Sequence, residues 1–260
     1  PRKDDEWDAY LGARMVYLRM GGCRKAIETT EEERVLSRLT RAYSRVTNDR
    51  KRQVARLRAV LLELAPEMLH AAWEGPQPDS KAMLYLLERW PGFEGIERAQ
   101  LRSIEKILHQ CRYGSKATHV AKLIREMARG IVVAAEERSA VTLELSLLVR
   151  QILVCNESAD QVYAEIARRV ERHPVGQKLL EMHGIGPVIA GVLVSELLPV
   201  ARTSTEPKCA TYSGVTPLVS KSGKSLDNDR LSQGVNKRVL HALYTSSVVA
   251  IKNSAVDRAY

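Results

Sequence analysis

Apolar residues at helical spacing run through most of this chain. The clearest run follows Thr30-Glu31-Glu32-Glu33, where a threonine cap and first-turn acids are typical of a helix start. No Pro or Gly follows until Pro66, so the pattern predicts one helix ending near Ala65, roughly 50 Å long at 1.5 Å per residue. Its apolar positions follow three- and four-residue spacing: Leu36, Leu39, Tyr43, Val46, Leu57, Val60 and Leu64. Broken at Arg50 and Gln53, this face packs either inside its own domain or against a second protomer.

The same periodicity predicts that the rest of the chain is mainly α. A short N-terminal helix is expected to stop at Gly21-Gly22, and another lies within 74–95. Further helices are expected at 97–110, 115–129, 131–154, 158–172, 177–182, 187–197, from 209 and at 231–252. Asn156 and Ser158 are expected to separate the helix at 131–154 from the helix at 158–172. Residues 217–228 are rich in Ser, Lys, Gly and Asp and are expected to form a loop.

A second stripe on the long helix is basic. Its members fall within about 60° of one another at 100° per residue, and they are Arg34, Arg38, Arg41, Arg45, Arg52 and Arg56. Between residues 34 and 58 the only acid is Asp49. A charged stripe is usually a solvated face, but one with so few acids favours phosphate contact. We therefore name Arg38, Arg41, Arg45 and Arg52 as candidate DNA-binding residues.

Charge and cysteine content narrow the class of protein. Lys and Arg exceed Asp and Glu by nine, a balance that favours a polyanionic partner. The cysteines are far apart, without metal-ligand spacing, which indicates free thiols in a reducing compartment. No run of about 18 apolar residues predicts a membrane span, and no signal peptide is visible. A cytoplasmic, nucleoid-associated protein is the expectation.

A glycine turn joins two predicted helices at His183-Gly184-Ile185-Gly186-Pro187. Helix–Gly-Ile-Gly–helix is the pattern of a helix-hairpin-helix, in which glycines let the backbone approach a phosphate and free N–H groups bind its oxygens. The alternative is an ordinary tight turn between packed helices. With apolar flanks on both sides, the pattern favours Gly184 and Gly186 as DNA-backbone contacts.

The loop around Ser222 combines hydroxyls with cations. A serine needs activation and charge stabilisation to attack a phosphodiester, and the basic residues here are Lys221, Lys224, Arg230, Lys237 and Arg238. Composition alone equally suits a flexible basic loop, and it does not distinguish among Ser220, Ser222, Ser225 and Ser232. Near the N-terminus, Asp5 and Asp8 share a helical face and suit Mg²⁺, although a surface acidic turn has the same pattern.

The order of these motifs resembles the "IS one-ten" family of insertion-sequence recombinases, which includes the Piv DNA invertase. Lys3 to Ala9 is similar to the family's K-x-D-x-x-D-A segment, and Leu179 to Leu197 matches its L-x-x-x-x-G-I-G-x-x-x-A-x-x-L-x-x-E run. Tyr212 to Pro217 followed by Ser222-Gly223 matches Y-x-G-x-x-P…S-G. The likeness covers essentially the whole chain.

The resemblance implies a fold and a chemistry. It implies a partial RuvC-like domain with a long basic helix (1–73), a helical or coiled-coil arm (74–173) and a C-terminal transposase domain with a helix-hairpin-helix (174–260). Ser222 becomes the nucleophile that links covalently to DNA, and Asp5 and Asp8 become catalytic Mg²⁺ ligands of a D-E-D-D tetrad. The resemblance also implies a homo-oligomer in which the tetrad acids of one subunit act with the serine of another, and some members of the family are directed by a structured bridge RNA.

Departures from the family pattern are also present. Gln233, Val235 and Leu240 stand where Lys, Gly and Arg are expected, although Asn236 is kept. The first tetrad Asp and the Glu are expected on strands before residue 1. The alternatives are a sequence trimmed at both ends, a decayed element and a divergent branch, and with half of the acidic set missing the chain is expected to be inactive by itself. The leading hypothesis is a DNA transposase or recombinase. Its rivals are a non-catalytic helix-hairpin-helix DNA-binding module and a charged helical scaffold.

Overall fold

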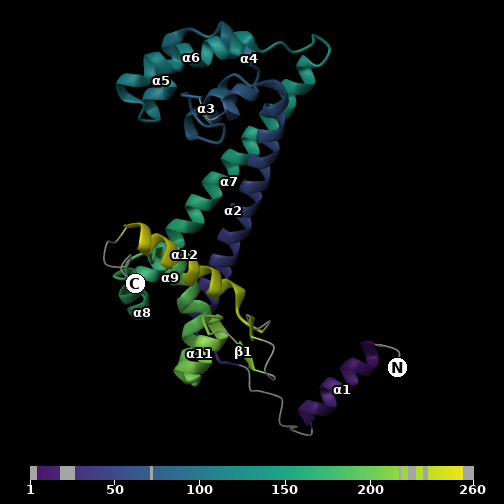
Figure 1. The fold of residues 1–260 in the computed structure, drawn as a ribbon, viewed down its shortest axis with the longest axis vertical. Coiled ribbons are helices and arrows are strands. Elements are labelled where there is room, and N and C mark those ends of the chain that lie inside the picture. The colour runs from purple at the N-terminus through teal and green to yellow at the C-terminus, as the bar shows by residue number, and fades with distance from the viewer. Residues whose placement is uncertain are drawn as a thin grey trace. The chain divides into compact units, whose positions relative to one another are not determined.

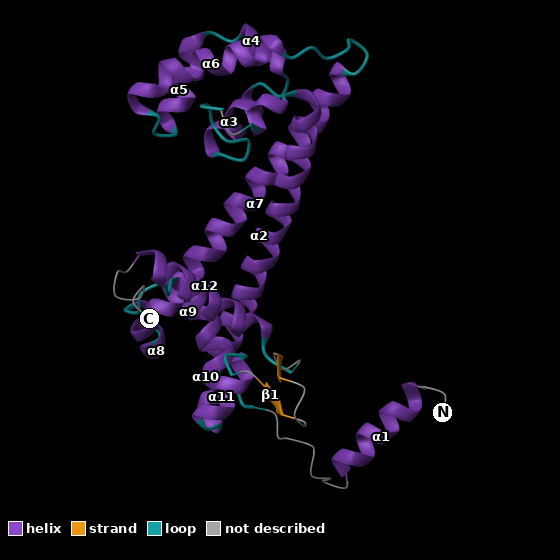
Figure 2. Cartoon of the chain, in the orientation of Figure 1, coloured by secondary structure: helices purple, strands orange, loops and turns teal. Residues whose placement is uncertain are grey.

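The computed structural model describes residues 5–17, 27–70, 73–216, 218–221, 227–230 and 234–253. For Asp5, Asp8 and the strand residues only the backbone is described. Helices predominate, with one short pair of strands (Figure 2). The α-helices are α1 (Asp5–Tyr17), α2 (Glu31–Leu64), α3 (Lys81–Arg89), α4 (Phe93–Arg98), α5 (Leu101–Gln110), α6 (Ala117–Gly130), α7 (Arg138–Arg172), α8 (Pro174–Leu180), α9 (Pro187–Val192), α10 (Leu198–Thr203), α11 (Glu206–Ser213) and α12 (Lys237–Asn253). Shorter helical turns are η1 (Pro66–Leu69), η2 (Gly114–Lys116) and η3 (Leu193–Leu197), and the strands are β1 (Leu218–Lys221) and β2 (Asp227–Arg230).

The start of α2 is a capping box, as its sequence predicts. The Thr30 N–H donates to Glu33 Oε2 at 2.8 Å, and the Glu33 N–H donates to Thr30 Oγ1 at 3.2 Å. The helix ends at Leu64 because Ala65, which precedes Pro66, leaves the helical region with φ −146°. The predicted helix and its limits are therefore confirmed to within a residue.

The chain forms two compact units. Unit 1 comprises residues 1–38 and 169–260, and unit 2 comprises residues 39–168. Both α2 and α7 contribute residues to each unit. These units reflect packing, and the division at residues 73 and 173 drawn from the sequence stays a prediction about family domains.

Unit 2 has a contiguous apolar core. The apolar face of α2 enters it through Val54, Leu57 and Leu61. Ala65, η1 and the helices α3, α4, α5, α6 and α7 supply the remaining side chains. Helices α4 and α5 pack on α6, and α3 packs on α5. The apolar face of α2 therefore packs inside its own domain over this stretch, which is one of the two arrangements that its pattern allowed.

Within unit 2, α2 and α7 run side by side in opposite directions (Figure 1). The rings of Tyr43 and Tyr163 lie 6.3 Å apart, and seven residues further along α2 the Nε of Arg50 donates to Asn156 Oδ1 at 2.6 Å. The partner position in α7 falls by seven as the position in α2 rises by seven, which is the register of an antiparallel pair.

The predicted break at Asn156 and Ser158 is wrong, because α7 continues from Arg138 to Arg172. Asparagine interrupts helices when its side chain competes for the local backbone. Here the Asn156 amide oxygen accepts from Arg50 of α2 and not from the local backbone. By length and composition alone α7 is apolar enough to cross a membrane, but a core helix passes the same test, and Leu145, Val149 and Ile152 lie in the unit 2 core.

Unit 1 is built around α9, η3 and α12. Helix α12 packs on α9, η3 and α11, while α8 packs on α9 and α10 packs on η3. Buried side chains at Ala190, Val194 and Val239 mark the contact. The prediction of a loop over 217–228 is wrong in part, since β1 and β2 pair antiparallel with Leu218 opposite Arg230 and Lys221 opposite Asp227.

Candidate functional site

The predicted glycine turn joins α8 to α9, and its two glycines are unlike each other. Gly184 has φ 81°, and a Cβ there would stand 2.3 Å from the Ser246 carbonyl oxygen and 3.0 Å from the Ala250 nitrogen, both in α12. Gly186 is the N-cap of α9 at φ −98°, and a Cβ there would meet nothing within 4 Å. Gly184 is therefore required for packing against α12, while the position of Gly186 also has room for a side chain.

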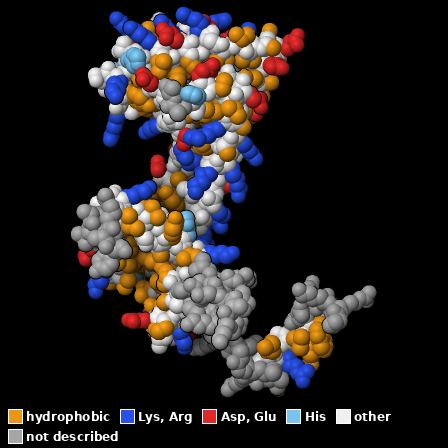
Figure 3. All heavy atoms as spheres, in the orientation of Figure 1, with side chains coloured by type: hydrophobic (Ala, Val, Ile, Leu, Met, Phe, Trp, Pro, Cys, Tyr) orange, Lys and Arg blue, Asp and Glu red, His pale blue; other side chains and the backbone are white. Residues whose placement is uncertain are grey.

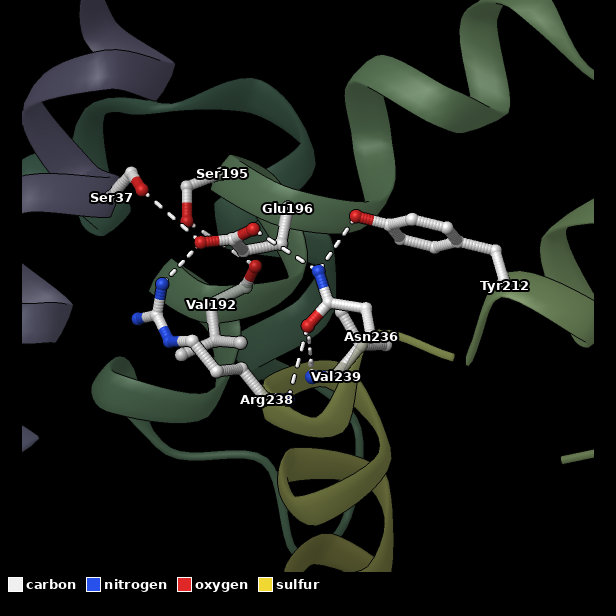
Figure 4. A network of polar contacts seen from close by, with 8 residues as sticks. All are labelled: Ser37, Val192, Ser195, Glu196, Tyr212, Asn236, Arg238 and Val239. Atoms are coloured by element: carbon white, nitrogen blue, oxygen red, sulfur yellow. Dashed lines mark hydrogen bonds and ion pairs between the residues drawn. The ribbon is translucent and has the colours of Figure 1, made fainter. Parts of the chain in front are cut away.

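A polar network lies at the centre of unit 1, around Glu196 in the π-helical stretch η3 (Figure 4). Glu196 Oε1 accepts from Ser37 Oγ at 3.1 Å and pairs with the Arg238 guanidinium. Glu196 Oε2 accepts from Asn236 Nδ2 at 3.1 Å. The carboxylate is 11% exposed, so these are charge-assisted bonds formed largely out of water. Segments far apart in the sequence thus meet at one carboxylate.

Asn236 connects this carboxylate to α11 and α12. Its Oδ1 accepts from the backbone N–H groups of Arg238 at 3.0 Å and Val239 at 3.3 Å, which caps α12. Its Nδ2 donates to Glu196 and also to Tyr212 Oη at 2.6 Å. Backbone N–H groups only donate, so the capping bonds assign the oxygen and hence the direction of the amide nitrogen.

Of the basic residues predicted near Ser222, the two on α12 differ in their surroundings. Arg238 is 29% exposed and pairs with Glu196, so a carboxylate inside the protein already neutralises it. Lys237, one residue earlier, is exposed. One helical turn apart along the same face, His241 and Tyr244 are also exposed, and Tyr244 is 68% accessible.

Ser222 and Lys224 lie outside the described residues, between the end of β1 at Lys221 and the start of β2 at Asp227. Lys221 and Arg230 lie on the paired strands, at opposite ends of the ladder. The backbone thus brings the flanks of Ser222 together as an antiparallel hairpin, a more defined setting than the predicted loop.

Asp5 and Asp8 lie three residues apart on α1, as predicted. Two carboxylates on successive positions of one helical face suit a hard cation but supply only part of its ligands. Among the described residues no cluster of three or more His, Cys, Asp or Glu side chains could hold a metal ion. The donor set fits Mg²⁺ in kind, and further ligands must come from elsewhere.

The predicted arginine stripe lies on the exposed face of α2, where Arg38, Arg41, Arg45 and Arg52 all point to solvent. Arg52 also pairs with Asp49 at 3.0 Å across one helical turn. Arg50 lies off this stripe and is used internally, bonded to Asn156 and paired with Asp79 at 3.7 Å. Figure 3 shows Lys and Arg side chains over much of the visible face of unit 2. The location of the basic stripe is confirmed, and its contact with phosphates stays a prediction.

Sequence reasoning missed the role of Ser37 and the joint role of Tyr212, Asn236 and Glu196. Asparagine directly before an apolar helix is an N-cap signal, which could have identified Asn236. An acid within the apolar run 187–200 could have singled out Glu196, because a buried carboxylate requires a partner. Cavities of about 320 and 460 Å³ in unit 2, beside Trp90 and beside Arg50, are lined by no predicted site residue.

Comparison with known proteins points to one group. Residues 176–260 match the model described as the Transposase IS116/IS110/IS902 family. The chain is 24% identical over 79% of its length to the insertion element IS110 uncharacterized 43.6 kDa protein of Streptomyces coelicolor, covering 50% of that protein. It is 23% identical over 85% of its length to the insertion element IS116 uncharacterized 44.8 kDa protein of Streptomyces clavuligerus, covering 55% of it.

A third relative is the insertion element IS900 uncharacterized 42 kDa protein of Mycobacterium paratuberculosis, 22% identical over 70% of this chain and covering 45% of that protein. The chain thus spans about half the length of the curated relatives it matches. No solved structure is significantly similar to it.

Proposed function

Because residues 176–260 match the transposase family of IS116, IS110 and IS902, we propose that this chain is part of an insertion-element DNA transposase. The match carries the proposal because it spans the glycine turn, Glu196 with its partners Asn236 and Arg238, and both strands. The whole protein cuts and rejoins DNA in the cytoplasm, where the nucleoid lies.

In this proposal Ser222 is the nucleophile. Its Oγ attacks a DNA phosphorus, so that a serine–phosphate ester forms while the bond to one deoxyribose oxygen breaks. The serine proton passes to a base, and the departing oxygen takes up a proton as a hydroxyl. Attack by the hydroxyl of another strand reverses the step and rejoins DNA. The energy of the broken phosphodiester is conserved in the ester, so rejoining requires no nucleotide cofactor.

Cations near Ser222 stabilise the charge that develops at the phosphorus. Lys221 is supported in this role by its place at the end of β1 beside Ser222, and Lys237 by its exposure at the start of α12. Arg230 lies at the other end of the ladder, and its role stays a proposal from the sequence. Arg238 instead pairs with Glu196 inside unit 1, so its role in this proposal is to hold that carboxylate and not to contact DNA.

Asp5 and Asp8 would supply two of the oxygen ligands of a catalytic Mg²⁺ site in a RuvC-like domain. When bound, Mg²⁺ neutralises phosphate charge and polarises the scissile bond. The remaining acids of the D-E-D-D tetrad would complete this site. In the assembled multimer the acids of one subunit would act with Ser222 of another.

Binding to DNA is proposed to involve the arginine stripe of α2 and the backbone at Gly186, which would act as a helix-hairpin-helix contact. A Cβ at Gly186 would meet nothing within 4 Å, which supports this assignment. All of these are phosphate contacts, which position the protein but read no sequence. The proposal also includes a structured guide RNA that selects the DNA target. It further includes assembly into a homo-oligomer with a coiled-coil arm.

The test uses the full-length protein and a DNA substrate that carries its insertion-element ends. Denaturation after reaction is expected to leave a protein–DNA adduct whose modified peptide contains Ser222. Ser222→Ala should abolish the adduct and strand exchange, whereas the matched controls Ser220→Ala and Ser225→Ala should retain both. Undiminished exchange by Ser222→Ala would exclude the serine role.

A second candidate function is a non-catalytic DNA-binding module, favoured by the free space beside Gly186 and the exposed arginines of α2. It predicts duplex binding whose affinity falls steeply with salt, is unchanged in Ser222→Ala and is never accompanied by an adduct. Adduct formation by the full-length protein therefore decides between the two.

A further inference from the structure

The segment that carries Ser222 begins and ends at one hydrogen-bonded point. The Asn236 N–H donates to the Tyr212 carbonyl oxygen at 2.8 Å, and the Asn236 side chain donates to the hydroxyl of the same tyrosine at 2.6 Å. Gly214 turns the chain out of α11 at φ 76°, and a Cβ there would lie 3.2 Å from Val235. The residues on either side of the hairpin are therefore in contact.

This closure is tied to the interior of unit 1 by a single carboxylate. Asn236 Nδ2 donates to Glu196 Oε2, while Glu196 Oε1 is occupied by Arg238 and Ser37. Both oxygens of Glu196 therefore accept, and both hydrogens of the Asn236 amide are used. Such a network fixes the side-chain direction, because reversing the amide would set its oxygen against the carboxylate.

We propose that Asn236 is a positioning residue that anchors both ends of the β1–β2 hairpin, through Tyr212 and Glu196, and so holds Ser222 in place for reaction. The link to reaction rests on the proposed function, whereas the anchoring of the hairpin does not. Asn236 does not need to touch DNA for this role.

Asparagine is suited to the position for a reason that can be tested. Aspartate caps a helix as well as asparagine does, so Asn236→Asp keeps the bonds from Arg238 and Val239. It replaces the donating amide by a second carboxylate facing Glu196, and like charges repel. The variant therefore breaks the link to Glu196 while leaving the cap of α12 in place, and the Tyr212 hydroxyl can still donate to the new carboxylate.

The opposite change at Glu196 provides the rescue. In Glu196→Gln with Asn236→Asp, the Gln amide donates to the Asp carboxylate, so donor and acceptor exchange places without a change in net charge. Asn236→Asp sets two carboxylates against each other, and Glu196→Gln sets two amides against each other. The double variant again pairs an amide with a carboxylate. Ser37→Ala is the matched control, because it removes a bond to the same carboxylate without touching Asn236 or Tyr212.

Amide hydrogen exchange of β1 and β2 in the full-length protein tests the anchor directly. We expect about tenfold faster exchange in Asn236→Asp, the factor that corresponds to the loss of one charge-assisted bond. The double variant should return to within about a factor of two of the parent, and Ser37→Ala should leave the strands unchanged. Tyr212→Phe should speed amide exchange by less than Asn236→Asp does. If Asn236→Asp does not fold, Tyr212→Phe is the variant that tests the anchor.

The reaction supplies the second readout. At saturating DNA the rate of Ser222 adduct formation should fall about tenfold in Asn236→Asp with unchanged DNA affinity, and the double variant should recover it. The anchor would be overturned if the amide exchange rates of β1 and β2 stayed at the parent value in Asn236→Asp. It would also be overturned if the double variant failed to return to the parent rates. A parent that forms no adduct would instead overturn the proposed function, and the amide exchange result would still decide the anchor.

Discussion

Gly184, in the turn between α8 and α9, lies so close to Ser246 of α12 that a Cβ at Gly184 would stand 2.3 Å from the Ser246 carbonyl oxygen. A backbone oxygen in a packed helix cannot move aside as a flexible side chain can. The glycine pair that suggests a phosphate contact in the sequence thus has one member whose position is fixed by the fold.

Replacement of the two glycines should separate folding from DNA contact. Gly184→Ala should lower the free energy of unfolding by at least about 2 kcal/mol, because a left-handed φ costs about 1–2 kcal/mol without glycine and the clash adds to it. Gly186→Ala should change stability little, since nothing lies within 4 Å of the new Cβ. Urea denaturation measures both. Weaker duplex binding by Gly186→Ala at unchanged stability would support the backbone contact, and unchanged binding would contradict it.

The buried carboxylate of Glu33 should contribute strongly to the free energy of unfolding of unit 1. Its oxygens face the Arg202 guanidinium at 2.8 and 2.9 Å, and it also accepts the Thr30 N–H in the capping box. Glu33→Ala should cost about 3 kcal/mol, since it removes a buried ion-pair partner and a helix cap together.

The matched variant Glu33→Gln keeps a capping oxygen and should cost less. Arg202→Ala should cost about as much as Glu33→Ala, because it leaves the carboxylate of Glu33, which is 1% exposed, buried without its cation. Thermal denaturation ranks the three variants. If Glu33→Gln proved as damaging as Glu33→Ala, charge pairing rather than capping would be the larger contribution.

The arginines of α2 should contribute to DNA binding through charge alone. Arg45→Ala should reduce the slope of log affinity against log salt by about 0.9, the value for one phosphate contact on duplex DNA. Arg50→Ala is the control, since Arg50 bonds to Asn156 and pairs with Asp79 and should affect stability with no change in slope. Equal slopes for the parent and Arg45→Ala would remove Arg45 from the interface.

Two cysteines should react slowly in the folded protein. Burial raises the pKa of the Cys111 thiol, with Lys81 opposing the shift, and burial together with Asp49 raises the pKa of Cys155. At pH 8 both thiols therefore carry less thiolate than in the unfolded chain, and alkylation by iodoacetamide should be slower than after denaturation.

The same shifts determine how stability depends on pH. The raised thiol pKa values contribute stability that is fully present below the unfolded-state pKa and is lost as pH rises through the folded-state pKa. Mass spectrometry of alkylated peptides over a pH series checks the alkylation rates, and denaturation over the same series checks stability. Equal rates in folded and unfolded protein would contradict the burial argument.

Local patterns in the sequence determined much of this protein. The capping box at Thr30, the end of α2 before Pro66, the exposed arginine stripe and the glycine turn all follow from neighbours within a few positions, because helix caps and helical faces are short-range properties. Three cysteines, Cys111, Cys155 and Cys209, are free as predicted, and Cys23 lies outside the described residues.

Only the tertiary structure decided the rest. The bond from Arg50 to Asn156 joins residues 106 positions apart, and the Glu196 network joins Ser37 to a carboxylate 159 positions away. The pairing of β1 with β2 and the contact of Tyr212 with Asn236 likewise arise where the chain returns to itself. A sequence pattern reports which face of an element is apolar, but it carries no information on which distant donor reaches a buried acceptor. Such pairings depend on the packed arrangement of the whole unit.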